Sequence, residues 1–267
     1  MSFTSKLALA SNQQEPILSS STVISASDLN WGHLNPLRGN KSPAAANLWG
    51  DRTKNKATGM LVKFKPGFSS PAHIHNITYR GVVIKGLLHN DDPNAEKLWL
   101  PTGSYWTQPA GESHITAANG QQNLIYLEID HGPYLVKPSS QQYDNGERPV
   151  NLHADNLVWL PFKSTPSPFT DVEISHLWGK HQKGEPRASL LKLPKGFKGT
   201  ISATTGEFKA VVIDGQLSYQ SAHRKQPLNL SEGSYFGSDG QFGHNIKTEQ
   251  AVTLYLRTTD QFELESL

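Results

Sequence analysis

The chain repeats itself once, at a spacing near 130 residues, and this feature limits its fold more than any other. A shift of 129 residues places Leu-Trp-Gly at 48–50 on Leu-Trp-Gly at 177–179, and Val-Val-Ile at 82–84 on the same run at 211–213. Further pairs follow in the same order, one of them with one extra residue of shift: Gly67-Phe68 with Gly196-Phe197, Gly86 with Gly215, Gly103-Ser104-Tyr105 with Gly233-Ser234-Tyr235, and Ile125-Tyr126-Leu127 with Leu254-Tyr255-Leu256. Because solenoid repeats are roughly 20–50 residues long, this period indicates a duplicated domain.

Short β-branched and aromatic runs alternate with turn residues along both copies. The 22 glycines and 17 prolines are spaced between such runs, for example those at 59–64 and 123–129. Runs of this kind predict strands joined by turns, and no long amphipathic helix is evident. We therefore predict an all-β fold with domains at 22–150 and 151–267, joined by a linker at 137–148.

Composition excludes several classes of function. With 25 Lys and Arg against 23 Asp and Glu, and no long basic run, nucleic acid is an unexpected partner. No apolar stretch approaches the roughly 18 residues of a membrane span. The absence of cysteine removes disulfides, thiolate zinc sites and cysteine nucleophiles. We expect a cytoplasmic protein, although a disulfide-free periplasmic protein would have the same composition.

The N-terminal segment differs from the rest of the chain. Residues 1–21 are polar and rich in Ser and Gln, which predicts a mobile or strand-swapped arm. The apolar stretch at 6–10 is too short for the core of a signal peptide. It is compatible with the stub of one that has been trimmed.

Three histidines in the first copy have the spacing of a metal site. His73 and His75 are one residue apart, so they share one face of a strand. His114 follows in the run Pro-Ala-Gly-Glu-Ser-His. Three imidazoles that converge from two strands suit Fe(II), Mn(II), Ni(II), Cu(II) or Zn(II). The alternative is a set of hydrogen-bonded interior histidines without a metal.

The second copy lacks most of this pattern. Aligned with the first, it has Ser202 and Thr204 at the first two histidine positions and Phe208 opposite Tyr79. Only His114 keeps a counterpart, His244, for which we expect a hydrogen-bonding role. Because one imidazole cannot hold a divalent metal alone, we predict a single site in the first half. The second half then supplies packing area, a lid or a dimer surface.

These residues match the two short motifs of the cupin superfamily. The first motif, G-x5-H-x-H-x3-E-x6-G, is matched at every position except the glutamate, which is Tyr79 here. The second motif is G-x5-P-x-G-x2-H. The matching residues are Gly67, His73, His75 and Gly86 for the first, and Gly103, Pro109, Gly111 and His114 for the second. With the repeat, the chain resembles a bicupin, and in particular an uncharacterised bacterial cupin family related to the cupin domain of ChrR-type anti-sigma factors.

The resemblance implies a jelly-roll barrel (double-stranded β-helix) in each half and a metal inside the first barrel. It also leads us to expect a homodimer, since cupins commonly pair through sheet edges. It does not imply one reaction, because cupins include dioxygenases, isomerases, decarboxylases, sensors and storage proteins.

Tyr79 lies four residues after His75 and should face the same interior if the strand continues. A phenol titrates near pH ~10 and is a poor ligand at neutral pH. We expect it to hydrogen-bond a metal-bound water, dioxygen or substrate, or alternatively to fill the barrel as Phe208 would. Without a carboxylate ligand the metal keeps its full charge, which favours an anionic or chelating substrate such as a carboxylate or diketone.

Other polar residues receive weaker predictions. Gln108 is a minor candidate for a position beside the metal. Glu112 could replace the missing carboxylate, although a solvated surface position is favoured. His89 and Asn90 are predicted as loop polar residues at a barrel mouth, and Glu128 as an exposed edge residue.

The leading hypothesis is a metal-dependent, dioxygenase-like enzyme that acts on a small organic acid or diketone-type molecule. It would use one divalent transition metal, namely Fe, Zn, Ni or Mn, with iron or zinc favoured. The first alternative is a non-catalytic metal or small-ligand sensor of the ChrR-like kind. The second is a structural bicupin whose metal only stabilises the barrel.

Overall fold

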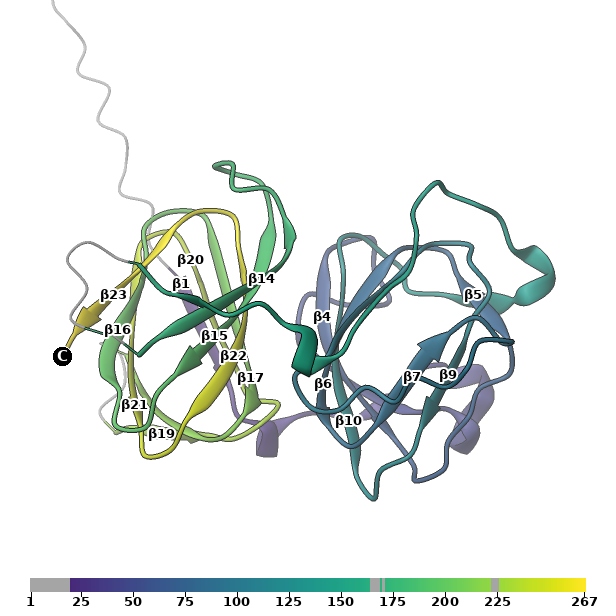
Figure 1. The fold of residues 1–267 in the computed structure, drawn as a ribbon, viewed down its shortest axis with the longest axis horizontal. Coiled ribbons are helices and arrows are strands. Elements are labelled where there is room, and N and C mark those ends of the chain that lie inside the picture. Colours follow the sequence, from purple (N-terminus) through teal and green to yellow (C-terminus); the bar gives the residue numbers. More distant parts are fainter. Residues whose placement is uncertain (1–19, 164–168, 170, 222–225) are drawn as a thin grey trace, which may run out of the picture.

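The computed structural model describes residues 20–163, 169, 171–221 and 226–267. These residues form β-strands and four short 3₁₀ helices, so the predicted all-β class is confirmed. Figure 1 shows two β units side by side, the first half of the chain in blue and teal and the second in green and yellow. Most of the predicted arm, residues 1–19, lies outside the described residues. No helix in the described ranges has the length and apolar character needed to cross a bilayer.

The first half contains one large antiparallel sheet and two small ones. The large sheet has the strand order β12-β8-β6-β10-β4-β3-β2, and the two-stranded sheets are β11-β5 and β7-β9. The strands are β2 (Gly32–His33), β3 (Ala44–Trp49), β4 (Thr58–Phe64), β5 (His73–His75), β6 (Tyr79–Lys85), β7 (Leu88–Asp91), β8 (Tyr105–Gln108), β9 (Ile115–Ala118), β10 (Asn123–Ile129), β11 (Val136–Pro138) and β12 (Val150–Leu152).

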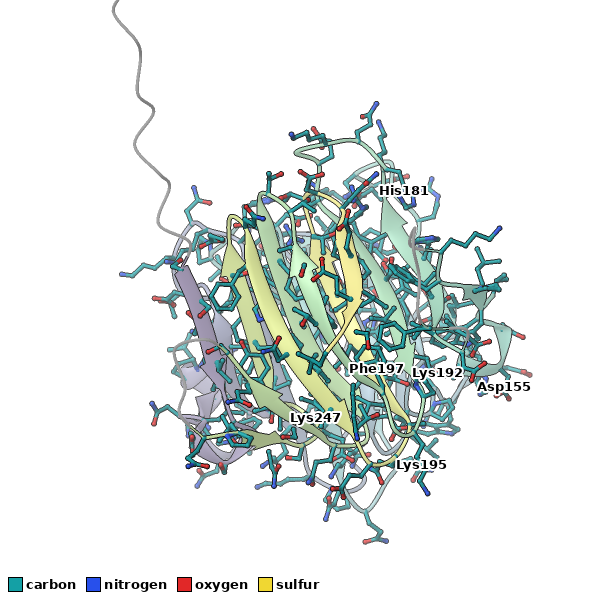
Figure 2. All side chains as sticks on the ribbon, turned by 90° about the vertical axis from the view of Figure 1, so that its left-hand side faces the viewer. Asp155, His181, Lys192, Lys195, Phe197 and Lys247 are labelled. Atoms are coloured by element: carbon teal, nitrogen blue, oxygen red, sulfur yellow. The ribbon has the colours of Figure 1, made fainter. Side chains whose placement is uncertain are left out.

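The second half has two large sheets, with the orders β1-β20-β17-β22-β15-β14-β13 and β19-β18-β21-β16-β23. Figure 2 faces this half and shows His181 and Lys195 at opposite ends of its long strands. The strands are β1 (Ser20–Ile24), β13 (Leu160–Pro161), β14 (Glu173–Gly179), β15 (Arg187–Leu193), β16 (Lys198–Ala203), β17 (Glu207–Asp214), β18 (Leu217–Gln220), β19 (Leu228–Leu230), β20 (Tyr235–Asp239), β21 (Phe242–Thr248), β22 (Val252–Thr258) and β23 (Phe262–Ser266).

The halves exchange their first strands. Strand β1 comes from the start of the chain but pairs with β20 in the second half. Strand β12, at the corresponding place in the second copy, pairs with β8 in the first half. Each exchanged strand covers an edge of the other half's large sheet, where unpaired backbone groups would otherwise be exposed.

The segment predicted as a linker is held against the first half. It begins in β11, which pairs with β5, and continues into the 3₁₀ helix η3 (Ser139–Gln141). Farther on, the Tyr143 N–H donates to the Gly111 carbonyl at 2.9 Å. The remaining 3₁₀ helices are η1 (Ala26–Asp28), η2 (Pro36–Lys41) and η4 (Ala154–Asn156).

Strand alternation divides the apolar residues into three cores. In β4, Met60 and Val62 point into the first half, whereas Leu61 points outward. In β17, Val212 points into the second half and Val211 points outward. The outward residues of both large sheets pack together as a third core, so the two halves form a continuous hydrophobic structure.

Equivalent residues of the two copies meet at this interface. Trp49 donates its indole N–H to the Tyr126 hydroxyl at 3.2 Å, and Trp178 donates to Tyr255 at 3.0 Å. The two tyrosine rings lie 5.0 Å apart. The repeat is therefore visible in space as well as in sequence.

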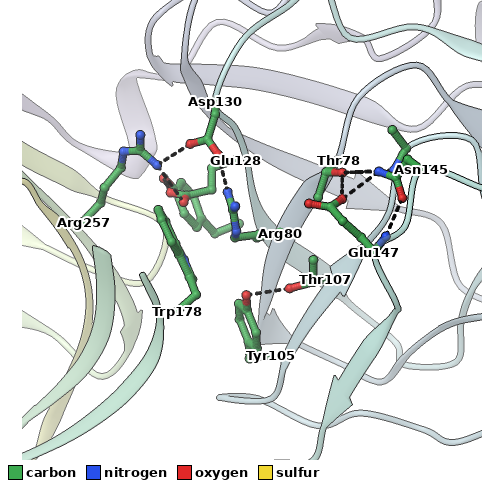
Figure 3. Close-up of polar contacts among 12 residues, drawn as sticks. Thr78, Arg80, Tyr105, Thr107, Glu128, Asp130, Asn145, Glu147, Trp178 and Arg257 are labelled. Carbon is green, nitrogen blue, oxygen red and sulfur yellow. Dashed lines mark hydrogen bonds and ion pairs between the residues drawn. The ribbon is translucent and has the colours of Figure 1, made fainter. Parts of the chain in front are cut away.

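The interface also contains a buried ion-pair network (Figure 3). Arg257 Nη1 lies 3.2 Å from Glu128 Oε1 and 2.9 Å from Asp130 Oδ1, and Arg80 Nη1 lies 2.7 Å from Asp130 Oδ2. Glu128 is fully buried, so the prediction of an exposed edge residue was wrong. The reason is that β10 runs between β4 and β6, and the partner Arg257 comes from the other half.

Candidate metal centre

The structure brings the three predicted histidines together. His73 and His75 lie on β5, and His114 directly precedes β9. The backbone N–H groups of His73 and His114 each donate to the other residue's carbonyl at 3.0 Å. One ring nitrogen from each of the three residues lies within 4.8 Å of the others. The antiparallel bridge thus fixes the spacing between the two segments that carry the rings.

The side-chain hydrogen bonds fix the tautomer of each ring. All three Nδ1 atoms face a backbone carbonyl, which can only accept, so each Nδ1 carries the proton. Each Nε2 is then unprotonated and presents its lone pair as an acceptor, the arrangement found for metal-binding histidines. The three pairs are His73 Nδ1 with Pro71 O at 2.9 Å, His75 Nδ1 with Leu135 O at 3.1 Å, and His114 Nδ1 with Glu112 O at 3.0 Å.

Burial keeps the three rings neutral. It is the main cause that lowers the pKa of each, and for His114 the pKa falls to about 3. The proximity of the rings lowers the pKa values of His75 and His114 further, because a second positive charge would be repelled. At neutral pH the site therefore presents three uncharged nitrogen donors.

Tyr79 is tied to a buried amide chain. Its hydroxyl donates to Asn90 Oδ1 at 2.9 Å, and Asn90 Nδ2 donates to Gln108 Oε1 at 2.8 Å. Thr116 also donates to Asn90 Oδ1, at 2.7 Å. Gln108 thus reaches Tyr79 through Asn90, and its Nε2 also makes a long, 3.5 Å hydrogen bond to the Glu112 carbonyl that accepts from His114. Burial raises the pKa of Tyr79.

The prediction that His89 and Asn90 are loop residues was wrong. Both lie in β7, which pairs with β9, and they are 1% and 2% exposed. His89 packs beside Trp99, with ring centroids 6.1 Å apart. The polar side chains of these two residues led to the prediction of a loop, whereas the segment is a strand in which both residues are buried.

Two acceptor atoms face each other in the site, the phenol oxygen of Tyr79 and Nε2 of His114. The Tyr79 oxygen lies 3.2 Å from His114 Nε2, but its only proton is donated to Asn90. A cation or an external proton donor placed between the two atoms would satisfy both. Three neutral imidazoles whose ring nitrogens lie within 4.8 Å of one another fit a divalent transition metal by their donor chemistry.

Tyr134 is a site residue that sequence reasoning missed. Its hydroxyl lies 3.2 Å from His75 Nε2, and its ring stacks on His75 with centroids 4.4 Å apart. It also packs edge-on against Tyr79, at 5.8 Å. Because 59 positions separate it from His75, no local spacing pattern could have indicated it.

The histidine cluster opens into an apolar pocket of about 260 Å³, lined in part by His73, His75, Tyr79 and Asn90. Arg38 on η2 also lines it and is exposed. The Trp106 indole N–H is buried and has no hydrogen-bond partner among the described residues. The apolar lining is Leu34, Val62, Phe64, Phe68, Trp106, Ile125, Leu127, Tyr134 and Val136.

Glu112 contributes its backbone rather than its side chain to the site. Its carbonyl accepts from His114 Nδ1, while its side chain lies in a different pocket, beside Tyr143 and Arg148. Burial raises the pKa of this carboxyl. In the part of the chain that the structure describes, no carboxylate joins the histidine cluster.

The equivalent place in the second half is filled without a metal site. His244 has both ring nitrogens engaged, Nδ1 with the Tyr219 hydroxyl at 2.9 Å and Nε2 with the Ser238 hydroxyl at 3.1 Å. Phe208, the counterpart of Tyr79, stacks on its ring with centroids 5.0 Å apart. The expected hydrogen-bonding role of His244 is confirmed.

Comparison with solved structures shows the cupin fold. A putative dioxygenase from Nostoc punctiforme PCC 73102 is 14% identical, with a TM-score of 0.69 over 93% of this chain and 87% of that one. Salicylate 1,2-dioxygenase from Pseudoaminobacter salicylatoxidans, as a gentisate adduct, is 12% identical, with a TM-score of 0.59 over 93% and 86%. Oxalate decarboxylase from Bacillus subtilis, described with Mn(II) centres, is 14% identical, with a TM-score of 0.53 over 92% and 79%.

The chain belongs to the DUF4437 family, a domain of unknown function whose model matches residues 22–265. No curated protein matches its sequence. The family match covers both halves.

Proposed function

We propose that this DUF4437 protein is a metal-dependent cupin enzyme with dioxygenase-like chemistry, acting on a small organic acid or diketone-type molecule. The observation that carries the proposal is the common tautomer of His73, His75 and His114. Three backbone carbonyls hold the Nδ1 protons, which leaves three unprotonated Nε2 atoms in one cluster. The Tyr134 hydroxyl is a donor for one of them, His75 Nε2, whereas the Tyr79 proton goes to Asn90 rather than to His114.

The three histidines would hold one divalent transition metal, with iron or zinc favoured. When bound, the metal would supply Lewis-acid chemistry and, if it is iron, the ability to activate dioxygen. The described ligand set is neutral and leaves the +2 charge of the ion uncompensated. Because opposite charges attract strongly in a buried site, an anionic or chelating substrate is favoured.

The surrounding residues have separable roles. Asn90 holds the Tyr79 proton away from the centre, so that the phenol oxygen faces the pocket as an acceptor. The buried Trp106 N–H, which interacts with Tyr79 without a well-formed hydrogen bond, is a donor for a substrate oxygen. The apolar walls exclude water, which strengthens every polar contact inside. Arg38 lines the same pocket and supplies a positive charge for a carboxylate.

A sensor of the ChrR-like kind would use the same histidines, so turnover separates the two hypotheses. We also propose a cytoplasmic location. We further propose a homodimer, and sedimentation of the purified protein would test this oligomeric state.

The first test is the metal content of untagged protein purified without chelators, measured by mass spectrometry beside His75→Ala. Near one equivalent in the wild type and more than tenfold less in the variant is expected. Oxygen uptake with small carboxylates and diketones follows, with His75→Ala as the inactive control. Metal binding without turnover, but with ligand-dependent changes in the metal spectrum, would favour the sensor instead. No metal in the wild type after reloading would contradict both.

A further inference from the structure

The second half has a cavity of its own, of about 550 Å³, at the end of its seven-stranded sheet. Residues of β14, β15 and β22 line it, together with segments at 160–163 and 261–262. His181, labelled in Figure 2 at the hairpin between β14 and β15, lies at its edge. The volume falls within the usual range for small-molecule sites, roughly 300–1,000 Å³.

One wall of this cavity gathers hydrogen-bond donors and positive charge. The rings of His176 and His181 meet edge to face, with centroids 4.7 Å apart. His176 Nδ1 lies 3.0 Å from the Ser189 hydroxyl, so its Nε2 is left for another partner. Arg187 lines the same wall.

Arg187 makes no ion pair with an acidic side chain of the described chain, although its charge helps to lower the pKa of the nearby Asp260. None of the ion pairs in the described parts of the chain includes it, and its guanidinium donates only a long, 3.5 Å bond to the Gln182 carbonyl. No Asp or Glu of the described chain lines the cavity. Burial, and after it the charges of His181 and Arg187, lower the pKa of His176, so its neutral form is favoured.

The rest of the lining is mainly apolar, with Lys163, Thr258 and Gln261 as its polar members. Phe162 and Phe262 stack with centroids 5.2 Å apart. Leu160, Ile174 and Leu256 also belong to this part of the lining. Ile174 and Leu256 are already buried in the core of this half, whereas Leu160, Phe162 and Phe262 are exposed or half-buried. An aromatic or aliphatic body would cover these three side chains, and a free inorganic anion would not.

We infer that the second half binds a carboxylate with an apolar body, its charge on Arg187, its oxygens accepting from His181 and His176, and its body against Phe162 and Phe262. Guanidinium pairs well with carboxylates because its planar donors match the two oxygens. This site needs no metal, and it stands whether or not the first half proves catalytic. It gives the second half a binding role beyond the packing role predicted from its lost histidines.

The test uses 4-fluorobenzoate as probe and the full-length protein, by ¹⁹F line broadening. Arg187→Met keeps the aliphatic stem of the arginine and removes its charge. It should weaken the binding of 4-fluorobenzoate to the second-half cavity at least fivefold. His181→Gln, on the exposed hairpin, should weaken the same binding. The matched control is Arg38→Met, which removes a charge at the first-half pocket and should leave that binding unchanged. A neutral analogue, 4-fluorobenzamide, should not distinguish Arg187→Met from the wild type.

Unchanged melting temperatures would show that both variants fold. Equal 4-fluorobenzoate affinity in the wild type, Arg187→Met and His181→Gln would overturn the proposal. So would an affinity that responds only to Arg38→Met, because the probe would then occupy the first half alone. Retention of Zn²⁺ by the His75→Ala protein, lost on adding His176→Ala, would assign the cavity to a metal and overturn the carboxylate.

Discussion

His114 and His244 occupy equivalent positions in the two halves, yet their ring nitrogens are used differently. In the first half a backbone carbonyl takes the Nδ1 proton and leaves Nε2 unprotonated at the triad, within 3.2 Å of a phenol oxygen that has no proton to give. In the second half two hydroxyl groups engage both nitrogens. Both rings are fully buried. The comparison teaches that burial of a histidine does not indicate a metal site, whereas the partner of each nitrogen does.

The largest difference between the halves should appear when this pair is truncated. His114→Ala should lower bound metal more than tenfold, because it removes one of three ligands. His244→Ala should leave the metal content near that of the wild type, although it creates a cavity of similar size. Metal analysis of the two purified variants measures this directly. Equal losses would mean that the metal, if bound, depends on general stability rather than on the triad.

The next largest effect should be at the interface, where Glu128 and Arg257 occupy equivalent positions of the repeat and pair with each other. Arg257→Met should cost about 3–5 kcal/mol of unfolding free energy, because Glu128 is left buried without its charged partner. Adding Glu128→Gln should recover part of the loss. Urea titration measures both. Arg148→Met, on an exposed pair with Asp144, is the control and should have no measurable effect.

Acid should destabilise the protein through its buried histidines, and His244 isolates the effect because burial alone lowers its pKa, from 6.5 to about 3. Between these pH values the unfolded state binds a proton that the folded state does not, so stability falls as the pH falls below 6.5. Above pH 6.5 the neutral His244 ring makes its full contribution to the free energy of unfolding. At pH 5 the loss amounts to roughly 2 kcal/mol, taking about 1.4 kcal/mol per pH unit.

His244→Gln should therefore reduce the difference in urea midpoint between pH 7 and pH 5. An unchanged difference would show that the ring titrates normally in the folded protein. Metal-free protein is used for both measurements, so that ligand protonation does not enter.

The smallest effect should come from converting the first half toward the second. Tyr79→Phe gives the first half the residue that the second half has at the equivalent position, Phe208. It should cost only about 1 kcal/mol, since one hydrogen bond is lost while Thr116 still donates to Asn90. Metal content should persist but turnover should fall. If the metal is lost instead, the phenol oxygen is itself a ligand.

The sequence was most informative where the evidence was local. The spacing of His73 and His75 places both on one strand, and the repeat marks which residues belong to the fold and which to the first half. Strands were predictable for the same reason, because alternation and turn glycines are local signals. The cupin motifs added His114 through a second short pattern.

Features that depend on distant partners could not be predicted. Glu128 was expected to be exposed because its partner Arg257 lies in the other half. Asn90 was expected in a loop because the strand that covers it, β9, comes 25 residues later along the chain. Tyr134 contacts His75 only through tertiary folding. In each case a polar side chain is buried by a contact that no local pattern encodes.

The exchanged first strands have a consequence for how this duplication can be taken apart. Removing residues 20–24 would shorten the first half in sequence but would expose the edge strand β20 in the second. A chain cut before Val150 would likewise leave β8 without its partner. Exposed edges invite pairing with other chains. Neither copy can therefore be removed without uncovering a sheet edge of the other copy.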